Sequence, residues 1–228
     1  MTTARPAAES SAPQSPAAES ATPGRRRPRG AVRAGLVAAG VELARAGGPD
    51  AVVLREATRL VGVVPNAAYR HFADRDQLLA AVCAAAMAEL GDRMADAVER
   101  IPGDRADPTA ARLRLGAIGT AYLRFAREEP GLFATAFAVP QQHSYPAPAG
   151  DEQGGDRSPL GQLRTALDAL VAAGVLDPGR RPGVEYPIWS AVHGLAVLTG
   201  QGPLREVGDA ELARLTHLTL AFIGESLG

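Results

Sequence analysis

Hydrophobic residues recur along most of this chain at the spacing of α-helices. From about residue 31 onward, apolar side chains stand three and four positions apart, a pattern typical of helices that bury one face. No segment alternates between polar and apolar residues as a half-buried strand would. The pattern therefore predicts an all-α protein. The expected helices span residues 31–46, 54–61, 65–71, 74–101, 109–128, 132–138, 159–173, 182–200 and 209–227.

Glycine, proline and aspartate mark the ends of the early helices. A Gly-Gly-Pro run at residues 47–49 should stop the first helix. Pro65 suits the first position of a short third helix, because its ring fixes φ and it has no N–H to leave unpaired. Asp74 should cap the fourth helix, its carboxylate accepting free backbone N–H groups. These signals predict two short helices that are joined by a turn at Gly62.

The fourth predicted helix is long and carries one continuous apolar face. Cys83 stands on this face, so we expect a buried, inert thiol rather than a nucleophile or redox sensor. A helix of this length would connect the two halves of the chain. The apolar face consists of Leu79, Val82, Cys83, Ala86, Met87, Leu90, Met94, Val98 and Ile101.

Two stretches are poor in large apolar residues. Residues 1–24 are mostly Ala, Pro, Ser, Thr and Glu, and such a segment cannot bury enough surface to fold. Residues 139–158 are predicted to form a long exposed loop. An export signal near the amino end is disfavoured, because Arg33 and Glu42 interrupt the apolar run that such a signal requires.

The composition excludes several functional classes. The chain has 228 residues, of which 46% are hydrophobic, enough for a sizeable core. The single Cys83 excludes an intrachain disulfide and a cysteine-based zinc site, and it fits a reducing cytoplasm. No stretch is long and apolar enough to span a bilayer. The four histidines show no metal-ligand spacing, and no nucleophile elbow, phosphate loop or dinucleotide fingerprint occurs. We expect a cytoplasmic protein that is not an enzyme and holds no metal or cofactor.

The charge is distributed unevenly, although the net charge is only −1. Every basic residue is an arginine. A local basic cluster can dominate an encounter even when the whole chain is nearly neutral. The cluster near the amino end consists of Arg25, Arg26, Arg27, Arg29 and Arg33.

The two short helices around Gly62, preceded by a longer one, form a helix-turn-helix pattern. Such a unit places its second short helix in the major groove of DNA. Asn66 could contact adenine, and Arg70 could contact guanine or a phosphate. Tyr69 and His71 could hydrogen-bond phosphate oxygens. The candidate DNA-binding residues are Arg29, Arg33, Pro65, Asn66, Ala67, Tyr69, Arg70, His71 and Arg75.

These residues also have a purely structural interpretation. Tyr69 could pack in a core, and Phe72 is better explained as a core anchor than as a DNA contact. Arg70 and Arg75 could pair with nearby aspartates on a solvated face. The concentration of these residue types on one short helix, downstream of an arginine-rich arm that could enter the minor groove, favours DNA binding.

Residues 33–79 resemble the DNA-binding domain of the TetR family of transcriptional regulators. The family pattern has matching positions at Gly62, Val63, Tyr69, His71, Phe72, Arg75 and Leu78. Val53 stands where the family often has Ser or Thr, Val64 stands where it often has Ser, and Thr58 replaces a usual small apolar residue. The resemblance implies a homodimer on double-stranded operator DNA, a carboxy-terminal ligand domain, and repression that a small-molecule effector relieves.

The carboxy-terminal part resembles, more weakly, a regulatory domain of that family with a Trp-x-x-x-His-Gly signature, here Trp189, His193 and Gly194. Trp189 and His193 lie four residues apart and share a helix face. They could line a ligand pocket, or they could belong to a packed core, which aromatic residues at this spacing form more often. The candidate ligand-binding residues are Tyr122, Phe125, Phe133, Phe137, Trp189 and His193.

The last predicted helix has apolar residues on more than one face. With the helix that carries Trp189 it could form a four-helix dimer interface, or it could dock on its own chain. Its main stripe consists of Leu212, Leu215, Leu218, Phe222 and Ile223, with Leu220 and Leu227 beside it.

The expected organisation has three parts. Residues 1–28 form a disordered tail, residues 29–76 a DNA-binding domain, and residues 77–228 a helical ligand-binding and dimerisation domain. The predicted function is a ligand-responsive transcriptional repressor. The alternative, motivated by Val53 and Val64, is a helical sensor or binding protein that has lost specific DNA binding.

Overall fold

The computed structural model describes Met1 and residues 29–104, 106–138 and 156–227. The predicted tail, apart from Met1, and most of the predicted loop at 139–158 lie outside these residues. The described part contains α-helices, two short 3-10 turns and no strand, so the all-α prediction is confirmed. The helices are α1 (Arg29–Gly47), α2 (Leu54–Val61), α3 (Pro65–Ala68), α4 (Arg75–Glu99), α5 (Pro108–Glu128), α6 (Pro130–Ala136), α7 (Pro159–Ala172), α8 (Glu185–Gly200) and α9 (Asp209–Leu227). The 3-10 turns are η1 (Pro49–Ala51) and η2 (Pro178–Arg180).

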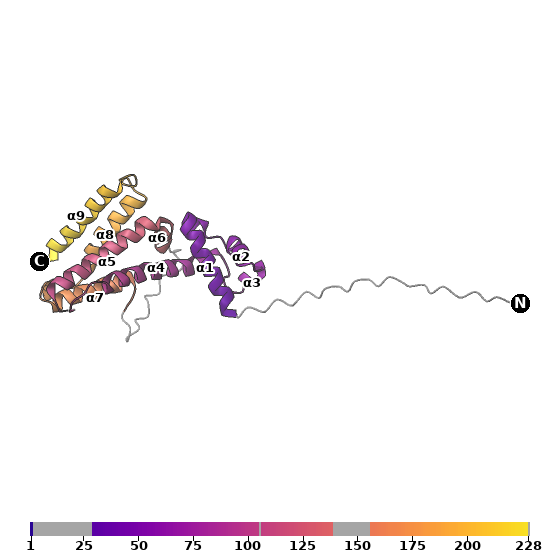
Figure 1. Cartoon of the computed structure of the whole chain (residues 1–228), viewed down its shortest axis with the longest axis horizontal. Coiled ribbons are helices and arrows are strands. Elements are labelled where there is room, and N and C mark those ends of the chain that lie inside the picture. Colours follow the sequence, from indigo (N-terminus) through magenta and orange to yellow (C-terminus); the bar gives the residue numbers. More distant parts are fainter. Residues whose placement is uncertain (2–28, 105, 139–155, 228) are drawn as a thin grey trace.

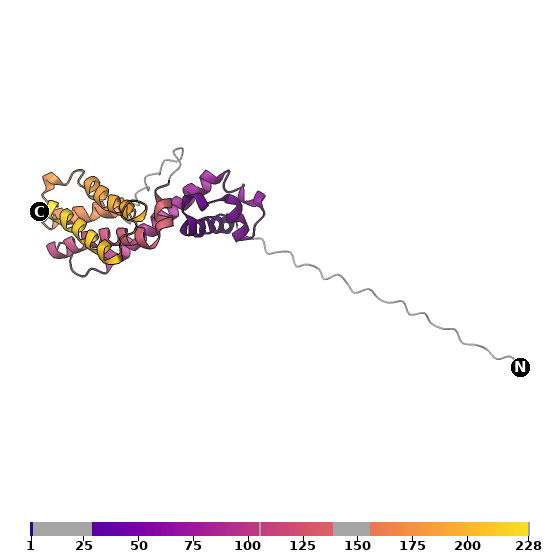
Figure 2. The same cartoon turned by 90° about the horizontal axis from the view of Figure 1, so that it is seen from above.

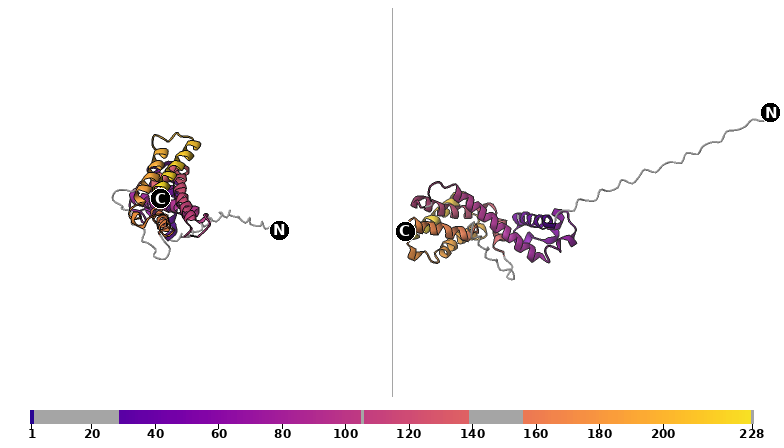
Figure 3. Two further views of the ribbon diagram at one scale, coloured as in Figure 1. Left: turned by 90° about the vertical axis from the view of Figure 1, so that its left-hand side faces the viewer. Right: turned by 90° about the horizontal axis from the view of Figure 1, so that it is seen from below.

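The helices form two bodies that share one long helix (Figure 1). Helices α1, α2 and α3 gather at one end of the molecule, and α5, α7, α8 and α9 form a bundle at the other end (Figure 2). Helix α4 runs from the small domain into the bundle, as the view from below shows most clearly (Figure 3). Its 25 residues give it a length of about 38 Å.

Helix α4 is built to pack at both ends. Asp74 caps it by accepting the backbone N–H of Gln77 at 2.8 Å, as the sequence predicted. Leu78 and Val82 are fully buried near its start, where α1 approaches so closely that a Cβ at Gly40 would lie 2.5 Å from a Val82 methyl. Leu90 and Met94 are buried farther along. The helix therefore contributes to the cores of both domains.

Helix α3 is shorter than the sequence suggested. It ends at Ala68, and the residues up to His71 form a turn in which the N–H groups of His71 and Phe72 both bond to the Ala68 carbonyl. Two donors that converge on one carbonyl replace regular helical pairing at this point. The boundary near His71 therefore marks the end of the turn rather than the end of the helix.

Candidate DNA-binding surface and ligand cavity

Gly62 sets the angle between α2 and α3. Its backbone is left-handed, with φ 71° and ψ 38°, a conformation that glycine adopts without steric strain. The N–H groups of Gly62 and Val63 bond to the Thr58 carbonyl at 3.0 and 3.1 Å, which closes the end of α2. The chain then enters α3 at Pro65, the first helical position. The predicted helix-turn-helix is therefore present in the backbone.

One face of α3 anchors it, and the rest of the segment is exposed. Ala68 is fully buried, whereas Pro65, Asn66 and Arg70 are exposed and Ala67 is half-buried. Tyr69 is 58% exposed, which excludes a core role for its ring. In the described part of the chain, no hydrogen bond or ion pair engages the side chains of Asn66, Tyr69 or Arg70. These side chains are available for a partner.

Two residues next to α3 have structural contacts of their own. Phe72 is 2% exposed, which confirms it as a core anchor, and the guanidinium of Arg33 lies 5.2 Å from the centre of its ring. Arg33 is exposed on α1, and its contact with Phe72 places it close to the turn that follows α3. Arg29 begins α1, but its side chain lies outside the described structure.

Arg75 braces the small domain. Its guanidinium donates hydrogen bonds to the carbonyls of Val52 at 3.0 Å and Pro49 at 2.7 Å, and so ties the start of α4 to the connection between α1 and α2. His71 beside α3 is half-buried. A phosphate contact by Arg75 or His71 stays a prediction, and Arg75 would have to make it with N–H groups that those carbonyls leave free.

An aromatic cluster lies where α5, α6 and α8 meet. The Tyr122 hydroxyl and the His193 Nδ1 are 2.8 Å apart. The ring of Tyr122 lies 5.6 Å from Phe133 and 6.3 Å from Trp189, and the ring of Phe137 lies 4.7 Å from His193. Five of the six predicted ligand-binding residues therefore come together. Phe125 does not join them.

Burial fixes the protonation of the Tyr122–His193 pair. Loss of water around the phenol raises the pKa of Tyr122, and burial lowers the pKa of His193 below its ordinary value. Both side chains are therefore uncharged at neutral pH. A neutral imidazole can accept the phenol O–H at Nδ1, which satisfies the buried hydroxyl.

A cavity of about 130 Å³ opens beside this cluster, between α4, α5, α7, α8 and α9. Tyr122 and Trp189 line the cavity. Phe133, Phe137 and His193 contact the ring of Tyr122 but do not line the cavity. Phe125 is fully buried elsewhere, with the Arg93 guanidinium 5.0 Å from its ring centre.

Sequence reasoning missed part of the cavity wall. Arg112 and Gly116 on α5, and Leu220 and Gly224 on α9, all line the cavity. Nothing lies within 4 Å of the position that a Cβ on Gly116 or Gly224 would take. Glycine inside a helix costs about 1 kcal/mol relative to alanine, so these two glycines were the available signal.

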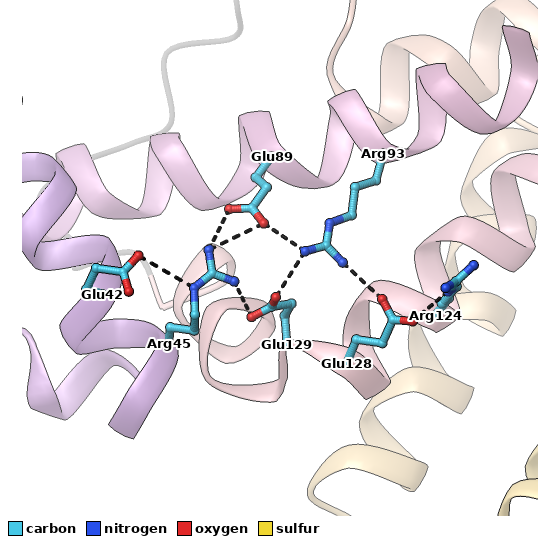
Figure 4. A network of polar contacts seen from close by, with 7 residues as sticks. All are labelled: Glu42, Arg45, Glu89, Arg93, Arg124, Glu128 and Glu129. Atoms are coloured by element: carbon cyan, nitrogen blue, oxygen red, sulfur yellow. Dashed lines mark hydrogen bonds and ion pairs between the residues drawn. The ribbon is translucent and has the colours of Figure 1, made fainter.

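A ring of four charged side chains joins the two domains (Figure 4). Arg45 on α1 bonds to Glu89 on α4 at 3.1 Å and to Glu129 at the start of α6. Arg93 on α4 bonds to the same two carboxylates, at 2.9 Å to Glu89 and 3.0 Å to Glu129. Each charge in the ring therefore has two opposite charges beside it.

The first turn of α6 also touches α1 directly. A Cβ on Gly131 would collide with the backbone carbonyls of Ala44 and Arg45, so only glycine allows this approach. Phe133, two residues farther along α6, contacts the ring of Tyr122. One short helix thus contacts both the DNA-binding domain and the aromatic cluster beside the cavity.

The outer faces of α8 and α9 are apolar and exposed. Phe222 is 67% exposed, and Leu218, Val197 and Leu198 are each between 40% and 50% exposed. Apolar side chains gathered on neighbouring helices are typical of a surface that another chain covers. In the part of the chain that the structure describes, no helix combines the length and apolarity needed to cross a membrane.

The chain combines a helix-turn-helix domain with a helical domain that contains an apolar cavity, and the two share one long helix. This is the architecture of a transcriptional regulator that binds DNA with one domain and a ligand with the other. Two family models match within this frame. Residues 36–82 match the bacterial regulatory proteins of the tetR family, and residues 115–222 match the tetracyclin repressor-like C-terminal domain. The chain belongs to the TetR family of transcriptional regulators.

Solved structures share the fold. A protein of unknown function from Rhodococcus sp. RHA1 is 23% identical with a TM-score of 0.62, covering 86% of this chain and 95% of its own. RolR in complex with resorcinol is 18% identical with a TM-score of 0.61, covering 88% and 89%. A putative TetR-family regulator from Shewanella sp. PV-4 is 16% identical with a TM-score of 0.58, covering 86% and 97%. No curated protein sequence matches this chain.

Proposed function

We propose that this TetR-family regulator is a repressor that binds a near-palindromic operator as a homodimer and leaves it when a small molecule fills the cavity. One observation carries the proposal. Helix α4 begins in the core of the helix-turn-helix domain, with Leu78 fully buried there, and its Met94 lines the cavity. A ligand in the cavity would therefore contact α4, the same helix that positions the DNA-binding surface.

The exposed residues of α3 and of the turn that follows it supply the DNA contacts in this proposal. Asn66 and Arg70 read base edges in the major groove, while Tyr69 and His71 hold phosphates and fix the register. Arg33, on the neighbouring helix, adds a contact to the DNA backbone. Arg29 and the arginines before it in the sequence would add further contacts. The proposed boundary between the DNA-binding and ligand-binding domains falls inside α4, near residue 76.

The exposed apolar faces of α8 and α9 form the proposed dimer interface. Two copies of this helix pair would pack as a four-helix bundle, covering Leu218 and Phe222. A two-fold dimer presents its two α3 segments to successive major grooves, about 34 Å apart. Release then requires only that the two segments lose this spacing.

Ligand release follows as a population shift. A molecule that binds more tightly to a state with α4 tilted increases the population of that state, and the size of the shift depends on the difference between its affinities for the two states. The neighbouring fold of RolR was solved with resorcinol, a single-ring molecule, and an apolar cavity of about 150 Å³ is known to admit benzene. The cavity of about 130 Å³ suits ligands on this scale.

The test uses operator fragments selected from genomic DNA with the full chain. Tyr69→Ala and His71→Ala should weaken binding to all sequences alike, whereas Asn66→Ala and Arg70→Ala should relax preference at particular base pairs. Arg157→Ala, an exposed arginine just before α7, is the matched control. Unchanged affinity in all four variants would show that α3 is not the reading element.

The release step has its own test. Structures of the dimer with and without ligand should differ in the separation of the two α3 segments, and an unchanged separation would refute the mechanism. A sensor that has lost specific DNA binding is the second candidate, because neither Val53 nor Val64 provides a side-chain cap. Absence of binding to random duplex at low salt would favour it.

A further inference from the structure

Two of the three polar side chains that line the cavity, Arg112 and Trp189, are hydrogen-bond donors without a hydrogen-bond partner among the described residues. Among the described residues that line the cavity, the side-chain polar groups are the Arg112 guanidinium, the Tyr122 hydroxyl and the Trp189 indole N–H. None of the lining side chains is a carboxylate or an amide. The Tyr122 hydroxyl is already paired with His193. The cavity therefore offers hydrogen-bond donors and a positive charge to its occupant, and no side-chain anion.

Arg112 has no partner in the described structure. No hydrogen bond or ion pair engages its guanidinium. Its neighbours on α5 differ, because Arg114 donates to the carbonyls of Gly103 and Asp104, and Arg124 pairs with Glu128. An unpaired arginine at the edge of an apolar cavity is free to bind an incoming anion.

The surroundings of Arg112 strengthen the positive potential at the cavity mouth. Arg112 also lines a groove between α4 and α5 whose other charged residues are Arg93, Arg100, Arg124, Asp96 and Glu128. Arg93 is paired with Glu89, Glu128 and Glu129, and Arg124 with Glu128, so Arg100 and Arg112 are the arginines of this groove without a carboxylate partner among the described residues. Such an excess of one sign raises the local concentration of ligands with the opposite charge.

One face of α5 runs from this charge into the cavity. Arg112, Gly116, Gly119 and Tyr122 follow one another at helical spacing, and about 15 Å of helix separates the first from the last. Gly116 leaves open space between the two polar ends. A ligand along this face would have its charged group near Arg112 and its apolar body against Gly116 and Leu220.

We infer that the effector is a small carboxylate with an apolar body, whose carboxyl group binds Arg112 at the cavity mouth. The inference rests on the proposed function, because it assigns the chemistry of the same cavity. Arginine presents two parallel N–H groups that match a carboxylate in a bidentate pair. Trp189, which lines the same cavity, carries the second unpaired donor of its wall.

The test uses the full chain and its own reporter. Trp189 is the only tryptophan, so its fluorescence follows occupation of the cavity. The probes are benzoate, 3-phenylpropanoate and octanoate, each compared with its primary amide. At least one acid should bind about 10- to 100-fold more tightly than its amide, the usual size of a charge-assisted hydrogen bond. Arg112→Gln should remove this difference, and Arg100→Gln, on the same groove but outside the cavity wall, should retain it.

A cavity-filling variant separates failure of this inference from failure of the proposed function. Gly116→Leu should abolish binding of acids and amides alike while leaving the fold intact, because its side chain would enter open space. If acids and amides bind equally and Gly116→Leu blocks both, the carboxylate inference is overturned and the ligand cavity stands. If no probe binds, or if Gly116→Leu has no effect on binding, the cavity is not the effector site and both fail.

Discussion

The ring of charges between the domains gives the sharpest prediction for stability. Glu129 is 16% exposed and pairs with Arg45 and Arg93, each 33% exposed. Glu129→Gln keeps the shape of the side chain but removes its charge. The amide oxygen can accept from one arginine, while the amide nitrogen then faces the other. The substitution therefore removes about one charge-assisted hydrogen bond, which contributes about 2 kcal/mol at partly buried sites.

The expected loss is measurable by thermal unfolding. For a chain of this size, about 2 kcal/mol corresponds to a fall of roughly 4–8 °C in Tm. The matched control is Glu211→Gln on α9, which pairs with Arg214 within one turn, the two side chains being 44% and 61% exposed. Exposed pairs of this kind contribute little to the free energy of unfolding, and salt screens them.

A double-mutant cycle isolates the contribution of the ring. Arg45→Gln and Glu129→Gln should be strongly non-additive, with a coupling energy of about 1–2 kcal/mol, because the two side chains share the same partners. Raising the salt concentration should reduce the effect of Glu211→Gln more than that of Glu129→Gln. If Glu129→Gln costs no more than Glu211→Gln, the ring does not stabilise the contact between the domains.

Three further predictions concern single side chains. Burial raises the pKa of the Cys83 thiol to about 11, so this 1%-exposed group should react with a disulfide reagent at pH 8 at least about 100-fold more slowly than in the urea-unfolded chain. Burial lowers the pKa of His193, so the unfolded chain binds the extra proton more readily than the folded chain. The free energy of unfolding should therefore have its full value above the ordinary histidine pKa of 6.5 and decrease as the pH falls below it, which urea midpoints at pH 7.5 and pH 5.5 would measure. Val64→Ser supplies the missing cap of α3 at a position that is 69% exposed, and it should raise the free energy of unfolding by about 1 kcal/mol, seen as a higher Tm.

Each of these predictions has a contradicting result. Rapid modification of Cys83 in the folded protein would show that the core opens around it. For His193, the control is His193→Gln, which should lose most of the pH dependence; an equal dependence in both proteins would place its origin elsewhere. An unchanged or lower Tm for Val64→Ser would mean that the hydroxyl does not reach the backbone N–H of Asn66, since Pro65 has no N–H and that of Ala67 already bonds to the Val64 carbonyl.

Local signals were sufficient to predict where the helices lie and the turn between α2 and α3, although α3 is shorter than predicted. The bounds of α2 were predicted correctly because Gly62 and Pro65 act on their own neighbours, through φ and a missing N–H. Arg75 shows where this kind of reasoning ends. Its carbonyl partners, Pro49 and Val52, lie more than 20 residues away in sequence, and nothing near Arg75 indicates them.

The cavity was only partly predictable for a related reason. Tyr122 and Phe125 are one turn apart on α5 and look equivalent in the sequence, yet one lines the cavity and the other fills the core beneath Arg93. Their difference depends on how α4, α8 and α9 are placed around α5. Arg112 was missed because an arginine on a helix is usually a solvated surface residue, and only the cavity beside it changes that interpretation.

Helix α6 is a second connection between the cavity wall and the DNA-binding domain in the proposed mechanism. Glu129 at its start belongs to the charged ring, Gly131 touches the backbone of α1, and Phe133 packs on Tyr122 in the cavity wall. Seven residues of helix span only about 10 Å and cannot bend appreciably over that length. A ligand that displaces Tyr122 therefore has two rigid routes to the DNA-binding domain, α4 and α6. Packed helices respond to such a displacement by changing from one arrangement to another rather than by yielding gradually, which is the behaviour that a switch between bound and released states requires.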